Sequence, residues 1–249
     1  MPRWRQAIAA LVLAANAPAI AVELLPSQPR AGQDFVLHFT AYIGCGVATT
    51  PTLSVSDSTI AISYREADAC YLLPPGFYMN LLANVPQPGT YRVIQKSLNT
   101  SSTRDEGLIT VLPSNPAATR TSTSLAGLWY VPSQPGWGLN VAEGQSGQLF
   151  LTWFTYGYTG GTGNYNYSSP YWFFTSGGRW TSPTEFTGIL AQGQGTDFSR
   201  PFDPNYFMTR PAGTATLTVT GPDTLTFTPT YAFAEGVKTQ SFNLTRYKF

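Results

Sequence analysis

Short runs in which apolar and polar residues alternate dominate the first half of the chain. Alternation places successive side chains on opposite faces of a strand. The clearest run is Phe35–Thr40, where Phe, Leu and Phe alternate with Val, His and Thr. The strands predicted here are Val22–Leu25, Phe35–Thr40, Leu53–Val55, Ile60–Ile62, Phe77–Leu82, Tyr91–Ile94 and Leu108–Leu112. About seven short strands separated by turn residues indicate a two-sheet β-sandwich over residues 22–113.

One segment of this sandwich resembles a known fold. Gln87-Pro-Gly-Thr-Tyr91, just before a predicted strand, resembles the corner that precedes the penultimate strand of immunoglobulin-like domains. The resemblance implies an immunoglobulin-like β-sandwich over residues 22–113.

The second half continues this pattern without any helical period, so the fold class is all-β. The predicted strands are Gly127–Val131, Trp137–Ala142, Gln148–Tyr156, Tyr171–Thr175, Phe186–Ala191, Thr196–Phe202, Ala212–Val219, Thr224–Pro229 and Thr239–Phe249. Consecutive strands with short links predict an antiparallel meander over residues 125–249. Because closure removes exposed edges, we expect it to form a small β-barrel of about eight strands. The first and last strands must then pair, and Arg246 should lie against the ring of Trp129.

One strand of this meander, Gln148–Tyr156, is apolar on both faces. Leu149, Leu151 and Trp153 form one row, and Phe150, Phe154 and Tyr156 form the other. A strand of this kind needs a covering layer outside as well as inside. The first half of the chain, a loop or a binding partner would supply that cover.

A change of composition separates the two halves. The segment Pro113–Ser124 consists of Pro, Ser, Thr, Ala, Asn and Arg without an apolar period, and it predicts a linker over residues 114–124. Apart from Trp4 near the start, the tryptophans all follow this segment: Trp129, Trp137, Trp153, Trp172 and Trp180.

The start of the chain has the pattern of a secretory signal peptide over residues 1–21. Arg3 and Arg5 precede the short apolar run Ile8–Ala15, and small residues lead to an expected cleavage after Ala21. The apolar run is too short to span a bilayer, so we expect an exported protein, periplasmic or extracellular, with no membrane span. In an exported chain the two cysteines, Cys45 and Cys70, are expected to form a disulfide.

The net charge of the chain limits the classes of binding partner that we expect. Without Arg3 and Arg5, 12 of the 14 Lys and Arg remain against 13 Asp and Glu, and charged residues are only 11% of the chain. A nearly neutral chain lacks the basic surface that neutralises phosphates, so nucleic acid is not an expected partner. We expect an uncharged glycan, a protein or a small apolar ligand.

The aromatic motifs of the second half resemble a known module. They are Gly127-Leu-Trp129-Tyr130-Val-Pro132, Gly136-Trp-Gly-Leu-Asn140, Trp153-Phe-Thr-Tyr156 and Tyr171-Trp-Phe173. Together they resemble a β module of exported bacterial proteins, of unestablished function, that often follows an immunoglobulin-like domain. The resemblance spans about Gly127–Phe249, and it implies export and architecture without implying a reaction. The G-x-W start and the late Arg246 also resemble lipocalin- and avidin-type barrels. This chain departs from the module after Tyr156, where Gly157 stands for the usual acidic residue and a longer insert runs to Pro170.

No arrangement of residues points to catalysis, a metal or a cofactor. The second half has no His or Cys, which excludes the usual nucleophile and base pairs there. Its carboxylates are Glu143, Glu185, Asp197, Asp203, Asp223 and Glu235, and most fall near predicted turns. We interpret them as solvated surface groups. The lone histidine, His38, lies within an alternating strand and is interpreted as structural.

The aromatic residues around the insert are the candidate ligand-binding residues: Tyr156, Tyr158, Tyr165, Tyr167, Tyr171, Trp172 and Trp180. Tyr combines a flat apolar face with a hydroxyl, which suits binding loops. The sequence thus favours a secreted, non-catalytic binding protein. Two alternatives stay open, a glycan-active hydrolase that uses carboxylates and a proteinase inhibitor. A buried pair of acids in a cleft would favour the hydrolase, and a rigid protruding loop would favour the inhibitor.

Overall fold

The computed structural model describes residues 22–41, 47, 49–66, 77–120, 123–158, 168–233 and 236–249. The predicted signal peptide, the predicted disulfide partners Cys45 and Cys70, and the predicted site residues Tyr165 and Tyr167 lie outside these residues. Within them the structure is all-β and contains no α-helix. Among the described residues, no helix has the length and apolar character needed to cross a lipid bilayer.

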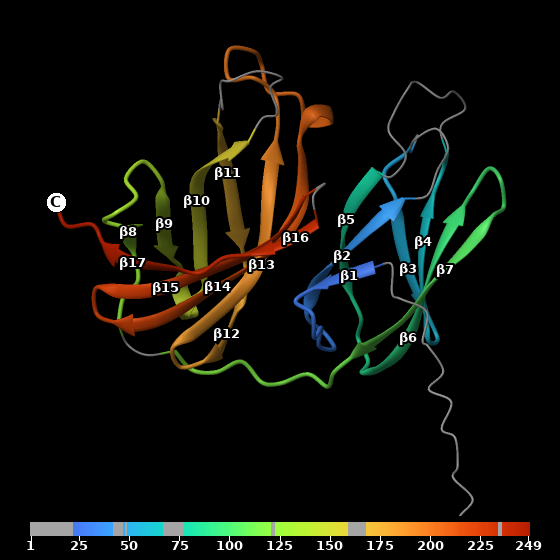
Figure 1. Ribbon diagram of the computed structural model, residues 1–249, viewed down its shortest axis with the longest axis horizontal. Coiled ribbons are helices and arrows are strands. Elements are labelled where there is room, and N and C mark those ends of the chain that lie inside the picture. Colours follow the sequence, from blue (N-terminus) through green and yellow to red (C-terminus); the bar gives the residue numbers. More distant parts are fainter. Residues whose placement is uncertain are drawn as a thin grey trace, which may run out of the picture.

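The N-terminal lobe, strands β1 to β7, consists of two sheets (Figure 1). One contains β1 (Val22–Leu25), β2 (Asp34–Ala41) and β5 (Phe77–Asn84), and the other contains β3 (Thr52–Ser56), β4 (Thr59–Tyr64), β6 (Gly89–Ser97) and β7 (Thr103–Val111). Pairing is antiparallel except between β4 and β6, which run parallel. Alternate residues of both sheets, such as Phe35, Ile62 and Val93, share one buried core. The seven strands predicted from alternation are confirmed.

The C-terminal lobe, strands β8 to β17, is built on a ring of eight strands. Its members are β8 (Gly127–Tyr130), β9 (Gly138–Glu143), β10 (Leu149–Tyr158), β11 (Ser168–Ser176), β13 (Glu185–Gln194), β14 (Met208–Gly221), β15 (Thr224–Phe233) and β17 (Phe242–Arg246). They follow the order β11-β10-β9-β8-β17-β15-β14-β13, and the pair Phe174 with Ala191 joins β11 to β13. β12 (Arg179–Ser182) and β16 (Gly236–Thr239) add to β13 and β15 outside this ring.

Two of the strand predictions for this lobe are wrong. Thr196–Phe202 is not a strand, because the Asp197 carboxylate accepts a hydrogen bond from the backbone N–H of Ser199 at 2.8 Å and bends the chain into a turn. Thr239–Phe249 is not one strand, because the chain leaves the ladder at Gln240, after β16 and before β17. The structure also adds β12, which the sequence pattern did not predict.

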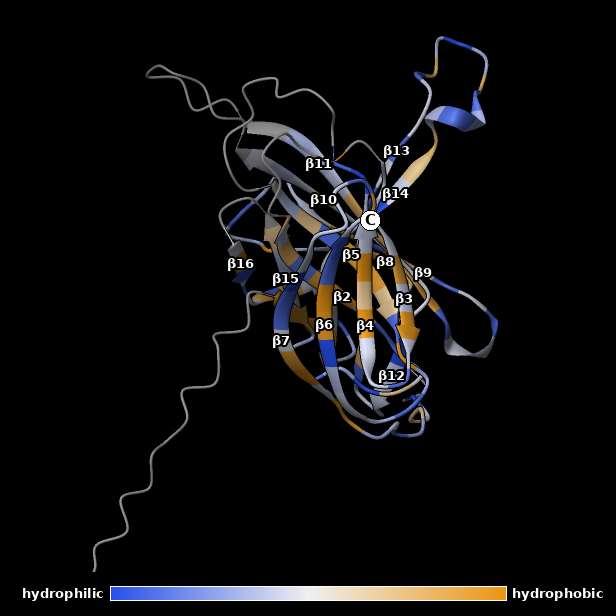
Figure 2. Cartoon of the chain, turned by 90° about the vertical axis from the view of Figure 1, so that its right-hand side faces the viewer, coloured by the Kyte–Doolittle hydropathy of each residue, from blue (hydrophilic) through white to orange (hydrophobic). Residues whose placement is uncertain are grey.

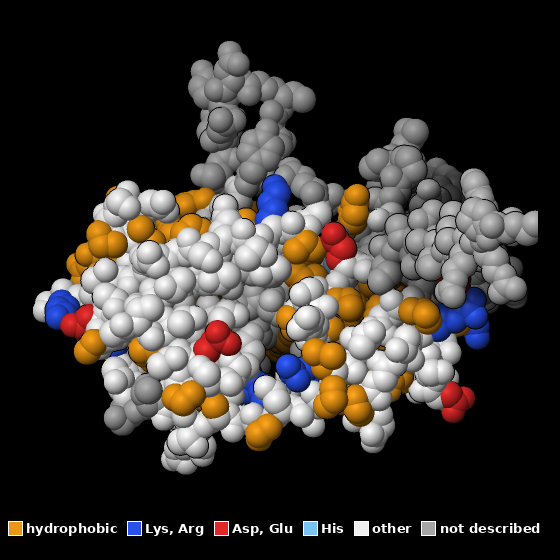
Figure 3. All heavy atoms as spheres, turned by 60° about the horizontal axis from the view of Figure 1, so that its bottom comes forward, with side chains coloured by type: hydrophobic (Ala, Val, Ile, Leu, Met, Phe, Trp, Pro, Cys, Tyr) orange, Lys and Arg blue, Asp and Glu red, His pale blue; other side chains and the backbone are white. Residues whose placement is uncertain are grey.

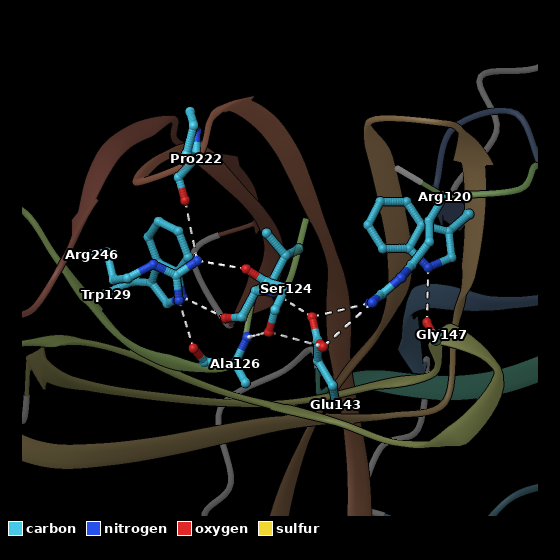
Figure 4. A network of polar contacts seen from close by, with 10 residues as sticks. Arg120, Ser124, Ala126, Trp129, Glu143, Gly147, Pro222 and Arg246 are labelled. Atoms are coloured by element: carbon cyan, nitrogen blue, oxygen red, sulfur yellow. Dashed lines mark hydrogen bonds and ion pairs between the residues drawn. The ribbon is translucent and has the colours of Figure 1, made fainter. Parts of the chain in front are cut away.

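The predicted pairing of the first and last strands is confirmed. Arg246 of β17 lies opposite Trp129 of β8, and its guanidinium carbon is 4.2 Å from the centre of that ring. The same guanidinium donates to the carbonyls of Ser124 and Ala126, both at 2.6 Å (Figure 4). It also donates to Asp223 Oδ1 at 3.0 Å. One cation therefore ties the last strand to the first strand and to the chain that enters it.

A short segment before β8 lies against both lobes. The Asn115 side-chain oxygen accepts from Gln33 Nε2 of the N-terminal lobe at 3.0 Å, and its carbonyl accepts from Arg179 Nη2 of the C-terminal lobe at 2.6 Å. Figure 1 shows this segment, in green, passing along both lobes. A small apolar cluster formed by Leu25, Val36 and Ala232 also joins them. The relative position of the two lobes is thus held at several points.

Candidate binding site

Strand β10 has two apolar faces, as predicted, and the ring separates them. Leu149, Leu151 and Trp153 face inward and are at most 5% exposed. On the outer face, Phe150 is 46% exposed and Tyr156 is 54% exposed. The described residues therefore leave the outer row partly uncovered, although such a row needs a covering layer.

Strand β11 continues this outer face with further rings. In the antiparallel register Phe154 lies opposite Trp172, and Tyr156 lies opposite Pro170. Directly opposite residues of a ladder share one face. Trp172 is 65% exposed. We call the surface formed by Phe150, Phe154, Tyr156, Trp172 and Phe174 the aromatic wall.

The rings of the wall lie directly opposite or diagonally across β10 and β11. Phe150 and Phe174 stack with centroids 6.2 Å apart and planes 17° from parallel. Thr152 of β10 lies beside this pair, opposite Phe174 of β11 on one side and opposite Asn140 of β9 on the other. An aromatic surface with a hydroxyl and an amide at hand combines flat apolar contact with hydrogen bonding.

A hollow of about 400 Å³ lies at one end of the wall. It is lined by Gly136, Phe154, Thr155, Tyr156, Pro170 and Trp172. None of these residues carries a charge. Gly136 lies beside the Tyr156 ring, and its φ of +104° is a backbone conformation that favours glycine.

A larger groove of about 690 Å³ lies between the lobes and meets the other end of the wall at Phe174. The N-terminal lobe contributes Asp34, whose carboxylate accepts from Asn84 Nδ2 at 2.8 Å. The C-terminal lobe contributes Arg179 and Phe207, among others. The wall therefore connects an open, uncharged hollow with a more polar groove.

The structure brings together two of the residues predicted to bind ligand, Tyr156 and Trp172. Tyr171 is instead half-buried and faces the interior, where it stacks on Phe173 at 6.2 Å. Tyr158 belongs to β10, but its side chain lies outside the described part of the structure.

Trp180, the remaining prediction that the structure describes, lies in the core. It is 6% exposed, and its Nε1 donates to the carbonyl of Gly147 at 2.8 Å. Gly147 precedes β10, whereas Tyr156 lies near the end of that strand. A buried ring at the opposite end of β10 is not available to a ligand at the hollow, so Trp180 is not part of the candidate site.

The residues predicted from the sequence to bind ligand did not include Phe150, Phe154, Phe174 or Asn140. The signal for the first two was present, because they form the second apolar row of Gln148–Tyr156. Phe174 and Asn140 join them only through the register of β11 and β9, which the sequence alone does not give.

The carboxylates of the C-terminal lobe are dispersed. Glu143 accepts from Arg120 Nη1 at 3.0 Å and from the backbone N–H of Leu125 (Figure 4). Burial raises the pKa of Glu143, but these bonds and one from Ser124 outweigh it and hold the pKa below its ordinary value. Asp223 binds Arg246, and it also forms an ion pair with Lys248.

Among the described residues, no acidic side chain lines the hollow, and only Asp34 lines the groove. The described residues contain no cluster of three or more His, Cys, Asp or Glu able to hold a metal ion. The paired carboxylates that glycoside hydrolysis requires are therefore not found at either surface. On the face shown in Figure 3, charged side chains are few and scattered.

No family model, no curated protein and no solved structure matches the chain.

Proposed function

We propose that this protein is an exported, non-catalytic binding protein whose aromatic wall binds an uncharged glycan. The observation that carries the proposal is the pair Trp172 and Tyr156. Their exposed rings flank a hollow without any charged lining. Flat rings stack on the apolar faces of sugars, and the hydroxyl of Tyr156 and the polar groups of Asn140 and Thr152 offer hydrogen bonds to sugar hydroxyls.

The architecture proposed for this function is an immunoglobulin-like sandwich followed by a small β-barrel. Two sheets with a shared core support the sandwich, and the pairing of β8 with β17 supports the barrel. We keep the predicted domain limits of 22–113 and 125–249, with the linker at 114–124. Export rests on the signal-peptide pattern, with cleavage after Ala21. The likeness to exported bacterial modules is consistent with both the two-domain architecture and export.

The groove between the lobes supports a ligand longer than one sugar ring. Trp172 and Phe174 are two residues apart on one face of β11, which corresponds to a spacing of about 7 Å. Phe174 opens into the groove, where Asp34 and Arg179 are able to bind hydroxyl groups. A chain stacked on Trp172 would thus be directed toward the N-terminal lobe.

The experiment is a screen of the purified mature protein against immobilised neutral glycans, followed by calorimetry with the best binder. We expect Trp172→Ala to weaken affinity by at least about tenfold, which is about 1.4 kcal/mol. Tyr156→Ala should weaken it less, and the double variant should abolish it. All three should unfold at the temperature of the unchanged protein, because the removed rings are more than half exposed.

Tyr247→Ala serves as the matched control, since this ring is 48% exposed but lies at the C-terminal end, outside the wall. It should bind like the unchanged protein. If no neutral glycan binds, or if the double variant of Trp172 and Tyr156 binds normally, the proposal is wrong. Selective binding of a protein or of a small apolar compound at the wall would assign the same surface to that class of ligand.

A further inference from the structure

The hairpin of β13 and β14 carries a loop that projects from the C-terminal lobe. The two strands pair continuously from Glu185 and Thr218 to Gln194 and Met208, apart from one register shift. Residues 195–207 then connect them. Figures 1 and 2 show this tip extending beyond the rest of the ring. It is the segment for which the sequence wrongly predicted a strand.

Hydrogen bonds within the loop hold its shape. The Thr196 hydroxyl donates to the Asp203 carbonyl at 3.2 Å and accepts from the Asp203 N–H at 2.8 Å, which closes the loop at its base. The Asp197 carboxylate accepts from Ser199, and the Asp203 carboxylate accepts from the N–H of Asn205 at 2.9 Å. Polar groups alone therefore account for the fold of the tip.

The aromatic rings of the tip take little part in this folding. Phe198 is 101% exposed, Phe202 is 71% exposed, and Tyr206 and Phe207 are 64% and 59% exposed. Solvent contact for so many large apolar side chains in one short loop is unfavourable, and exposed apolar groups gathered at one place mark an interaction site. The rings are thus available to an external apolar phase or partner.

The acidic and basic side chains of the tip differ in how far they are engaged by the loop itself. Both aspartates accept hydrogen bonds from the loop itself, and the bonds from the hydroxyl and the N–H of Ser199 lower the pKa of Asp197. Arg200 and Arg210 are exposed, and no ion pair of theirs is found within the described part of the chain. Arg210 Nε donates to Met208 Sδ at 3.3 Å, so within the described part of the chain both guanidinium groups flank the rings without a carboxylate partner.

We propose that this tip binds a lipid surface by inserting Phe198 and Phe202 into the interface of a bilayer, with Arg200 and Arg210 at the headgroup phosphates. A tip that projects from its lobe suits a fluid layer, which adapts to any shape. Tyr206, with an apolar ring and a hydroxyl, suits the interfacial region. Guanidinium groups near an anionic surface add attraction that salt screens.

A protein partner fits the tip less well. Protease clefts and sheet edges bind extended segments. Here the backbone turns at residues 197–200, where the N–H of Arg200 donates to the Asp197 carbonyl at 3.0 Å, and again in the 3-10 turn Pro204–Tyr206. This bent conformation favours the lipid surface over the proteinase-inhibitor alternative.

The experiment is co-sedimentation of the mature protein with vesicles of phosphatidylcholine, alone or mixed with phosphatidylglycerol. We expect binding to the mixed vesicles and at least about a tenfold loss of affinity in the double variant Phe198→Ser with Phe202→Ser. Arg200→Gln should weaken binding to the mixed vesicles only. The control is Phe249→Ser, because this C-terminal ring is fully exposed but lies outside the tip.

Insertion itself is tested with Phe198→Trp and brominated lipids, which quench an indole that enters the acyl region. Added quenching in Phe198→Trp, but not in Phe249→Trp, supports the proposal. Failure to bind either vesicle overturns it, as does equal binding by the double serine variant. Inhibition of a protease that the double variant loses, without vesicle binding, would assign the tip to a protein partner instead. Glycan binding at the wall is independent and should persist in the double variant.

Discussion

Replacement of Arg246 by Met removes the cation that joins the two ends of the ring. The side chain is 19% exposed and makes hydrogen bonds of 2.6 Å to the carbonyls of both Ser124 and Ala126. Bonds from a charged donor contribute about 1.5 kcal/mol each at the lower end of their range, which suits a partly exposed group. The contact with Trp129 contributes about 1 kcal/mol. Since the freed carbonyls regain some water, we expect a loss of about 3 kcal/mol.

Intrinsic tryptophan fluorescence provides the assay, because all the tryptophans outside the predicted signal peptide lie in residues 129–180. Thermal unfolding followed this way reports on the C-terminal lobe. We expect Arg246→Met to lower the thermal midpoint by roughly 10 °C. Arg246→Lys should recover less than half of the loss, because an ammonium cannot form the planar set of bonds.

Arg210→Met is the control, since this exposed guanidinium lies on the hairpin of β13 and β14, away from the ring closure, and should leave the midpoint unchanged. A double-mutant cycle with Trp129→Phe isolates the ring contact. A midpoint within about 2 °C of the unchanged protein in Arg246→Met would refute the reasoning that one cation closes the ring.

Three further predictions follow from buried or crowded positions. Glu143→Gln should flatten the fall in stability as pH drops below its ordinary pKa of 4.5, because the lowered folded pKa of Glu143 gives stability that is present above that value and is lost as pH falls toward the folded pKa; urea midpoints measured from neutral pH downward check this. Trp180→Ala should cost about 3–5 kcal/mol in urea unfolding by emptying a core site, while glycan binding per folded molecule is kept. Gly213→Ala should prevent normal folding, since a Cβ there would lie 1.9 Å from the carbonyl oxygen of Thr230, whereas Gly195→Ala, with open space, should be neutral by circular dichroism.

The strands of the N-terminal lobe could be predicted because local alternation decided them. In Phe35–Thr40 each apolar residue of the alternating row points into the shared core. Thr196–Phe202 misled the prediction because its Thr and Phe content is typical of strands. There the side chain of Asp197 forms a turn with its own backbone, and Pro201 and Pro204 cannot donate to a ladder.

The candidate site was predictable only in part. Tyr156 and Trp172 were identified because rings gather around the insert, and the second apolar row of β10 indicated a surface that requires cover. Whether a covering layer is present depends on tertiary arrangement, which alternation does not encode. Trp180 shows the converse, because composition cannot distinguish an exposed ring from one that fills the core beside Phe186.

The bonds of Asn115 to Gln33 and Arg179 have a consequence for the groove between the lobes. Two lobes on a free tether must lose rotational freedom when one ligand touches both, and that loss weakens binding. Here the opposing walls are already fixed by the chain that runs between them, so a ligand entering the groove meets a preorganised site. Asn115→Ala should therefore reduce the affinity for a long ligand that contacts both lobes. The loss should lie in the binding entropy, because the contacts between ligand and protein are unchanged.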